Sequence, residues 1–298
     1  MSLALDLLLV GLRHVVRPRL RRAHGPLEAR RAFDRAAAVT FRAPPFLCRI
    51  KDRAGLDRIH CGPRLHGKII LYFHGGGYVA GGPHTHAAML GQLSGLSQLE
   101  VCAPAYPLAP EHPFPAAFEG AVASWEHLMA AGYAPSDVVL GGDSAGGGLA
   151  LALLSYLCHA ATPPAAAFAM SPWCDLSLSG DSLQGNAERD PLLPAERIRE
   201  LVGYILPEGA DDADPRVSPL FAEFPTCPPV LLQYSETEIL FDDCRRMAER
   251  LRGFDADVLE RRHPRAPHVW HLFQGWVPEA RQSLREIADF ARAAFAAR

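Results

Sequence analysis

The sequence lacks an apolar run long enough to cross a membrane as a helix. Its most apolar stretch, residues 3–12, is interrupted by Asp6, which leaves six uncharged residues before Arg13. A membrane-spanning helix needs about 20 such residues. The positive charges follow this stretch, and no small-residue cleavage site is visible. We therefore expect neither stable membrane insertion nor a secretory signal.

The start of the chain predicts an amphipathic helix instead. Leu8, Leu12, Val15 and Val16 fall on one helical stripe, which is typical of a helix with one apolar side. The arginines between positions 17 and 22 could contact a membrane surface, but packing against the body of the protein is favoured.

Paired cysteine motifs are also missing. The seven cysteines are odd in number, widely spaced and never in a C-x-x-C arrangement. We therefore expect neither a disulfide framework nor a zinc site built from Cys and His. This pattern favours a reducing cytoplasm and a protein without a bound metal.

The chain has no excess of positive charge. Its 30 Lys and Arg residues and 33 Asp and Glu residues give a net charge of −3, so it carries no electrostatic footprint for nucleic acid. Lysine itself occurs only at Lys51 and Lys68. We attach no function to this bias toward arginine.

What the chain does contain is enough apolar residues for a large core. It has 298 residues, of which 49% are hydrophobic, and a chain of this size buries roughly 75% of its unfolded surface. Short apolar runs alternate with helical patterns, which predicts an α/β fold with a mostly parallel sheet covered on both faces. We expect strands over residues 68–73, 99–103, 137–141, 165–170, 230–234 and 258–261.

Residues 180–220 break this alternation. They are rich in Asp and Pro and contain one helical pattern, formed by Ile198, Leu201, Val202 and Ile205. An insertion of about 40 residues between two strands is well above ordinary loop length and usually serves a binding site.

The motif Gly142-Asp143-Ser144-Ala145-Gly146 follows one of the expected strands and precedes an expected helix. Small flanking residues allow the sharp turn that exposes a serine side chain at the edge of a sheet, beside the positive end of a helix. We therefore interpret Ser144 as a nucleophile.

A second motif, His74-Gly75-Gly76-Gly77, ends another expected strand. A glycine run lets backbone N–H groups approach a substrate oxygen closely. It lacks the Lys-Ser/Thr that a phosphate-binding loop would add. We expect the N–H groups of Gly75, Gly76 and Ala145 to form an oxyanion hole.

Together these motifs resemble the hormone-sensitive-lipase-like group of α/β-hydrolases. The resemblance extends to residues 106–115, Ser171-Pro172-Trp173 and Pro267-His268-Val269-Trp270, and it runs from about residue 68 to the C-terminus. It implies an α/β-hydrolase fold with a helical cap, and a serine carboxylesterase that needs no metal or cofactor. Within the group, the chain is most similar to bacterial esterases and lactone hydrolases.

The resemblance also suggests a division of the chain. We expect residues 1–45 to form an N-terminal cap segment and residues 46–298 to form the catalytic domain, with a cap insertion at about 180–220.

A serine nucleophile of this kind needs an acid and then a histidine later in the chain. His268 follows the last expected strand, in a loop, and occupies the family's histidine position. We predict that it is the base. His263 and His271 are its neighbours and remain alternatives.

The resemblance places Glu238 where most members of the group have Asp, so Glu238 is the predicted acid. Its extra methylene requires a shifted backbone or rotamer. Asp242 and Asp175 stay open as alternatives, although Asp242 is more typical of a carboxylate in the first turn of a helix. Glu236 is expected to face solvent.

Several other polar residues near these motifs are interpreted as structural. Asp143 is expected to form hydrogen bonds within the elbow or to the loop over 106–115, and Glu111 and His112 are expected to stabilise that loop. Tyr78 is expected to line the acyl or alcohol pocket.

The predicted reaction is hydrolysis of short to medium acyl esters, or of lactones, through an acyl-enzyme. An amidase or deacetylase would use the same triad, and a non-catalytic ligand-binding protein could share the fold. The expected partner is a small-molecule ester, with no nucleic acid, and a homodimer stays open.

Overall fold

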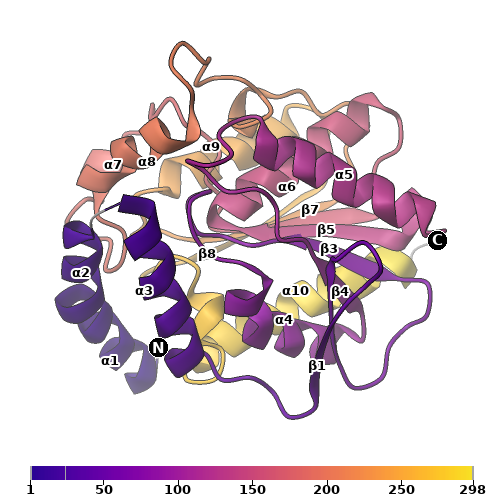
Figure 1. Ribbon diagram of the computed structural model, residues 1–298, viewed down its shortest axis with the longest axis horizontal. Helices are drawn as coiled ribbons and strands as arrows, with labels where there is room; N and C mark the ends of the chain where they lie inside the picture. The colour runs from indigo at the N-terminus through magenta and orange to yellow at the C-terminus, as the bar shows by residue number, and fades with distance from the viewer. Residues whose placement is uncertain (1, 24, 297–298) are drawn as a thin grey trace.

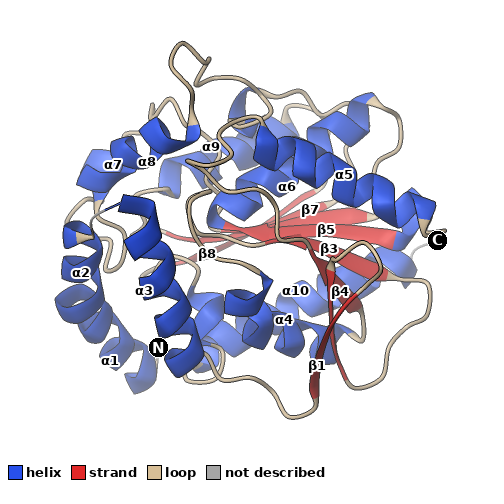
Figure 2. Ribbon diagram, viewed as in Figure 1, coloured by secondary structure: helices blue, strands red, loops and turns tan. Residues whose placement is uncertain are grey.

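The computed structural model describes residues 2–23 and 25–296 and contains one eight-stranded sheet in the order β1-β2-β4-β3-β5-β6-β7-β8. Figure 2 shows this sheet between layers of helices. The strands are β1 (Leu47–Lys51), β2 (Asp57–Cys61), β3 (Ile69–Phe73), β4 (Glu100–Ala103), β5 (Val138–Asp143), β6 (Ala166–Met170), β7 (Val230–Ser235) and β8 (Val258–His263). Strands β3 to β8 are parallel, which confirms the predicted α/β class.

The two antiparallel strands at one edge, β1 and β2, were not predicted. Neither strand contains an apolar run that would reveal it in the sequence. Strand β1 is largely exposed and includes charged residues. Arg49 on β1 and Asp57 on β2 form an ion pair at 2.6 Å, so charge takes part in pairing these edge strands.

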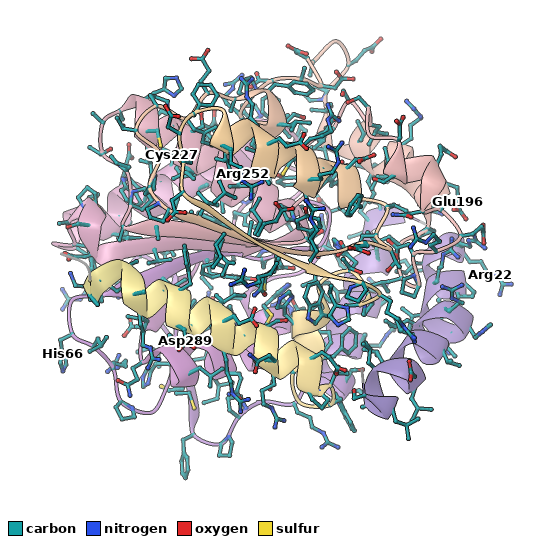
Figure 3. The ribbon with its side chains drawn as sticks, turned by 180° about the vertical axis from the view of Figure 1, so that it is seen from behind. Arg22, His66, Glu196, Cys227, Arg252 and Asp289 are labelled. Carbon is teal, nitrogen blue, oxygen red and sulfur yellow. The ribbon has the colours of Figure 1, made fainter. Side chains whose placement is uncertain are left out.

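The helices form two layers on the sheet. Helices α4 and α10 cover one face, and α5, α6 and α9 cover the other (Figure 1). Seen from behind in Figure 3, α10 with Asp289 and α9 ending at Arg252 lie on opposite sides of the sheet. The helices are α1 (Leu3–Gly11), α2 (Arg17–Arg22), α3 (Gly25–Thr40), α4 (Pro83–Ser97), α5 (Ala116–Ala130), α6 (Ser144–His159), α7 (Ser182–Gly185), α8 (Ile198–Ile205), α9 (Phe241–Arg252) and α10 (Pro278–Ala296).

Each face of the sheet has its own apolar core, and strand β3 shows how the sequence fills both. Ile69, Leu71 and Phe73 belong to the core under α5, α6 and α9, whereas Ile70 and Tyr72 belong to the core under α4 and α10. All five side chains are buried. Successive residues of a strand point to opposite faces, so a strand covered on both sides must be apolar throughout.

The N-terminal helices pack on the body of the protein, in a third apolar cluster with residues of the C-terminal region. Three of the four residues of the predicted stripe face the body of the protein. Leu12 is buried and Leu8 and Val16 pack on the cluster, but Val15 is 47% exposed, and Leu5, outside the predicted stripe, is fully buried. Residues 12–16 form a π-helical turn. Its wider turn rotates the following side chains relative to an ordinary α-helix.

The N-terminal helices also contact the insertion. Arg197, just before α8, donates hydrogen bonds to the backbone carbonyls of Arg21 and Ala23, and Arg13 donates to the carbonyl of Arg189. Figure 1 shows α1 to α3 and α7 to α8 on the same side of the molecule. In Figure 3, Glu196 and Arg22 lie at one edge. Among the described residues, no helix combines the length and apolar character that crossing a membrane requires.

The helix expected within the insertion is present as α8. The short helix α7 was not predicted, because a single turn leaves no periodic apolar pattern to detect.

Candidate active site

Ser144 lies at the junction of β5 and α6, where the chain turns sharply. Its φ of 52° is in the left-handed region, which non-glycine residues rarely adopt. The turn depends on glycine at both sides. A Cβ on Gly142 would lie 2.2 Å from the carbonyl oxygen of Gly146, and a Cβ on Gly146 would lie 2.2 Å from that of Phe73. The motif therefore forms a strained strand-to-helix turn that presents the serine.

Ser144, His268 and Glu238 form one continuous chain of hydrogen bonds. Nε2 of His268 lies 2.8 Å from Oγ of Ser144, and its Nδ1 lies 2.7 Å from Oε2 of Glu238. The three residues follow β5, β8 and β7, so the carboxyl ends of parallel strands bring them together. His268 and Glu238 are buried.

The glutamate fits this place because its second oxygen is also fixed. Oε1 accepts hydrogen bonds from the Ser171 hydroxyl at 2.8 Å and from the backbone N–H of Ser235 at 2.7 Å. The motif Ser171-Pro172-Trp173 does not by itself predict this role for Ser171. The sequence gives no distance between residue 171 and residue 238, so only the fold reveals this contact.

The glycine loop lies next to Ser144, but one of its N–H groups is already occupied. The N–H of Gly75 donates to Oδ1 of Asp143 at 2.9 Å. The expectation that Gly75 faces a substrate oxygen is therefore wrong. Among the residues that the structure describes, the N–H groups of Gly76 and Gly77 have no hydrogen-bond partner.

Known proteins share both the sequence and this architecture. A sequence profile for the alpha/beta hydrolase fold matches residues 70–272. An esterase of Acinetobacter venetianus is 36% identical over 225 residues, 75% of this chain and 74% of the relative. An acetyl-hydrolase of Streptomyces hygroscopicus is 38% identical over 232 residues, 78% of this chain and 77% of the relative.

A solved structure agrees over nearly the whole chain. It is an esterase from the bacterial hormone-sensitive lipase family, with a TM-score of 0.91, 33% identity and 99% coverage of both chains. The chain belongs to this family of α/β-hydrolases.

In this hydrolase, carboxylates influence the charge state of the His268 imidazole. Burial opposes a charged imidazolium, but the hydrogen bond and charge of Glu238 outweigh it, with further contributions from Asp190 and Asp143. The pKa of His268 therefore lies above its ordinary value of 6.5.

The two alternative histidines have other partners. Nδ1 of His263 accepts from the backbone N–H groups of Arg265 and Ala266 and so holds the loop that leads to His268. Nε2 of His271 lies 2.7 Å from Oε1 of Gln233, and burial lowers the pKa of His271 to about 3. Neither has a hydrogen bond to Ser144.

The alternative acids are engaged elsewhere as well. Asp175 accepts hydrogen bonds from the hydroxyls of Ser177 and Ser179, and Asp242 accepts from the backbone N–H of Ser182. Glu236 is exposed, as expected.

Asp143 joins the nucleophile turn to the glycine loop. Besides the N–H of Gly75, its carboxylate accepts from the Tyr72 hydroxyl at 2.6 Å and lies 3.2 Å from Nε2 of His86. Burial raises the pKa of Asp143, but the charge and hydrogen bonds of these neighbours outweigh it and lower the pKa. The partners thus lie on β3, α4 and the glycine loop rather than in the loop over 106–115.

Helices α3 and α8 approach the glycine loop from outside. A Cβ on Gly77 would lie 3.3 Å from Leu201 of α8, and a Cβ on Gly81 would lie 3.2 Å from Phe33 of α3. Tyr78 and Ile205 of α8 line a narrow, mainly apolar cavity. Helix α8 therefore lies next to the glycine loop, and α3 lies next to the segment that directly follows it. Among the described residues, no group of His, Cys, Asp and Glu is arranged to hold a metal ion.

Proposed function

We propose that this hydrolase is a serine carboxylesterase that cleaves short to medium acyl esters, including lactones, through an acyl-enzyme. The observation that carries the proposal is the unbroken line from Ser144 through His268 to Glu238, at 2.8 and 2.7 Å. An adjacent hydroxyl, imidazole and carboxylate form the arrangement that activates a serine.

In the first half of the reaction, His268 removes the proton from the Ser144 hydroxyl as its oxygen attacks the ester carbonyl. Glu238 fixes the imidazole orientation through Nδ1 and stabilises the imidazolium that forms. The imidazolium then gives its proton to the departing alcohol, and the acyl group stays on Ser144.

In the second half, a water molecule replaces the alcohol. His268 takes a proton from this water as it attacks the acyl carbon, and it returns that proton to the Ser144 oxygen when the carboxylic acid leaves.

We assign the oxyanion hole to Gly76, Gly77 and Ala145. The N–H groups of Gly76 and Gly77 have no partner among residues 2–23 and 25–296, and Ala145 is in the first turn of α6, where backbone N–H groups have no intrahelical acceptor. Gly75 has a different role, because its bond to Asp143 fixes the loop that presents its two neighbours.

We assign a cap to residues 1–45 and to the insertion at about 180–220, above a catalytic domain of residues 46–298. The support is the position of Leu201 beside Gly77 and of Phe33 beside Gly81, and the hydrogen bonds between the N-terminal helices and the insertion. An apolar cap side chain such as Leu201, next to the glycine loop, favours small esters.

We further propose that the enzyme works in the cytoplasm, since all seven cysteines are free thiols, and that it forms a homodimer. Leu3 and Leu7 of α1 are 73% and 65% exposed, and a second copy would cover them. Light scattering of the purified protein tests the dimer.

The deciding experiment combines labelling with a substrate panel. A fluorophosphonate should modify the wild-type protein and not Ser144→Ala, and both Ser144→Ala and His268→Ala should lose at least ~10³-fold in kcat while remaining folded. A folded variant with more than a tenth of wild-type activity would refute the assignment.

The panel should contain p-nitrophenyl esters, lactones and anilides. Cleavage of anilides in preference to esters would favour an amidase or deacetylase. A wild-type protein that neither reacts with the fluorophosphonate nor cleaves any of these compounds would favour a ligand-binding protein.

A further inference from the structure

Asp190 is a buried carboxylate in the insertion that the proposed reaction does not use. Its side chain is fully buried. Among the described residues, it has no ion pair with Lys or Arg, although a buried carboxylate is costly without a partner. Its neighbour Arg189 donates to the side chain of Asn186 instead.

Three backbone N–H groups satisfy the Asp190 carboxylate. Oδ1 accepts from Leu192 and Leu193, each at 2.9 Å, and so fixes the turn of the insertion itself. Oδ2 accepts from Ile239 at 3.0 Å. Ile239 directly follows Glu238, so this last bond ties the insertion to the loop that carries the proposed acid.

A second side chain of the insertion, Asn186, is also hydrogen-bonded to the loop that carries Glu238. Nδ2 of Asn186 donates to the carbonyl oxygens of Glu236, at 3.0 Å, and Glu238, at 2.8 Å. The acid loop, residues 236–239, is therefore held from outside by the insertion, at backbone atoms on both sides of the Glu238 side chain.

We propose that Asp190 is a positioning residue for the proposed triad: it fixes the backbone of the acid loop and places a second negative charge near His268. The inference rests on the proposed function and deepens it. It also explains how the longer Glu238 side chain keeps its carboxylate in place, since the insertion determines where its backbone lies.

The charge of Asp190 acts together with the other charged groups around the imidazole of His268. Glu238 is hydrogen-bonded to the imidazole, and the charges of Asp190 in the insertion and Asp143 in the nucleophile turn also raise the pKa of His268. His271 is neutral because burial lowers its pKa. Burial raises the pKa of Asp190, and its three N–H donors and the charge of His268 offset only part of that rise. A negative charge near His268 stabilises the imidazolium.

The test uses Asp190→Asn, which keeps the size of the side chain and removes its charge. The readouts are hydrolysis of p-nitrophenyl butyrate and the rate of fluorophosphonate labelling, both followed against pH. We expect kcat and the labelling rate to fall roughly 10- to 100-fold with little change in KM, because the acid loop is displaced. The acid limb of kcat/KM should also move to lower pH, because His268 loses a stabilising negative charge.

The matched control is Asp57→Asn. Asp57 is equally a buried carboxylate, but its partners are Arg49 and Lys51 on the distant edge strands. It should lower the Tm without changing kcat or the pH profile. Asp190→Ser is a second variant that guards against misfolding of the insertion. Its hydroxyl can still cap the turn at Leu192, but it carries no charge and does not reach Ile239, so both changes are expected here too.

The proposal is overturned if a folded Asp190 variant lacks either change, or if Asp57→Asn reproduces both. These outcomes differ from a failure of the proposed function itself. In that case the wild-type protein would neither hydrolyse the ester nor be labelled at Ser144.

Discussion

The residue before the proposed nucleophile, Asp143, accepts the N–H of Gly75 at 2.9 Å and thereby joins the nucleophile turn to the glycine loop. This single bond takes Gly75 out of the set of groups that can face a substrate. It also sets the position of Gly76 and Gly77 relative to Ser144. The two sequence motifs thus act as one structural unit.

The first prediction concerns the acid. Glu238→Ala should lose most activity, because it leaves His268 without its partner and exposes the Ser171 hydroxyl and Ser235 N–H to a cavity. Glu238→Asp should retain a measurable part, since a carboxylate remains but draws back by one methylene. Steady-state kinetics of both variants, with Asp242→Ala as the less affected control, checks this. Activity in Glu238→Ala together with an inactive Asp242→Ala would move the role to Asp242.

The second prediction concerns pH. The base must be neutral to accept a proton, and the pKa of His268 lies above 6.5, so kcat/KM should rise with pH through this raised value. Glu238→Gln removes the main stabilising charge, and the acid limb should therefore shift to lower pH as the rate falls. Asp242→Asn, which has no hydrogen bond to His268, should keep the wild-type limb. A Glu238→Gln profile at the wild-type position would contradict the charge argument.

The third prediction concerns the glycine loop. A Cβ on Gly76 would lie 2.2 Å from the carbonyl oxygen of Ala80, and its φ is 124°. Gly76→Ala should therefore displace the loop, with a strain of about 1–3 kcal/mol, and lower both Tm and kcat. The control is Gly203→Ala in α8. The added Cβ there would have no neighbouring atom within 4 Å, and helix propensity favours alanine by up to about 1 kcal/mol. Equal activity in the two variants would exclude a strict requirement at Gly76.

The fourth prediction concerns the cap. Arg30 on α3 donates to the carbonyls of Val79 and Ala109, at 2.6 and 2.7 Å, and pairs with Glu111 at 2.6 Å. Arg30→Ala should loosen α3 from the site. KM should rise more for a butyrate ester than for an acetate ester, because the shorter acyl chain makes fewer contacts with the side of the pocket that α3 forms. The control is Arg35→Ala, an exposed position on the same helix. An acyl-length profile like that of the wild type would show that α3 is not part of the pocket.

Much of this arrangement was accessible from the sequence, because local patterns carried it. The alternation of apolar strands and helices predicted the parallel sheet, and motif and chain order pointed to Ser144 and to a later histidine, for which His268 was the choice. The structure brings both residues within hydrogen-bond distance. A resemblance to a known family supplied the glutamate, where geometry alone left Asp175 and Asp242 open.

Tertiary structure alone decided the rest. Which glycine N–H stays free depends on where the Asp143 carboxylate lies, and the burial of Leu5 depends on packing against residues of the C-terminal region. The hydrogen bond from the N–H of Ile239 to Asp190 joins residues that are 49 positions apart. Sequence patterns report the periodicity and order of a chain, whereas a hydrogen bond between distant segments exists only once the sheet and the insertion are packed.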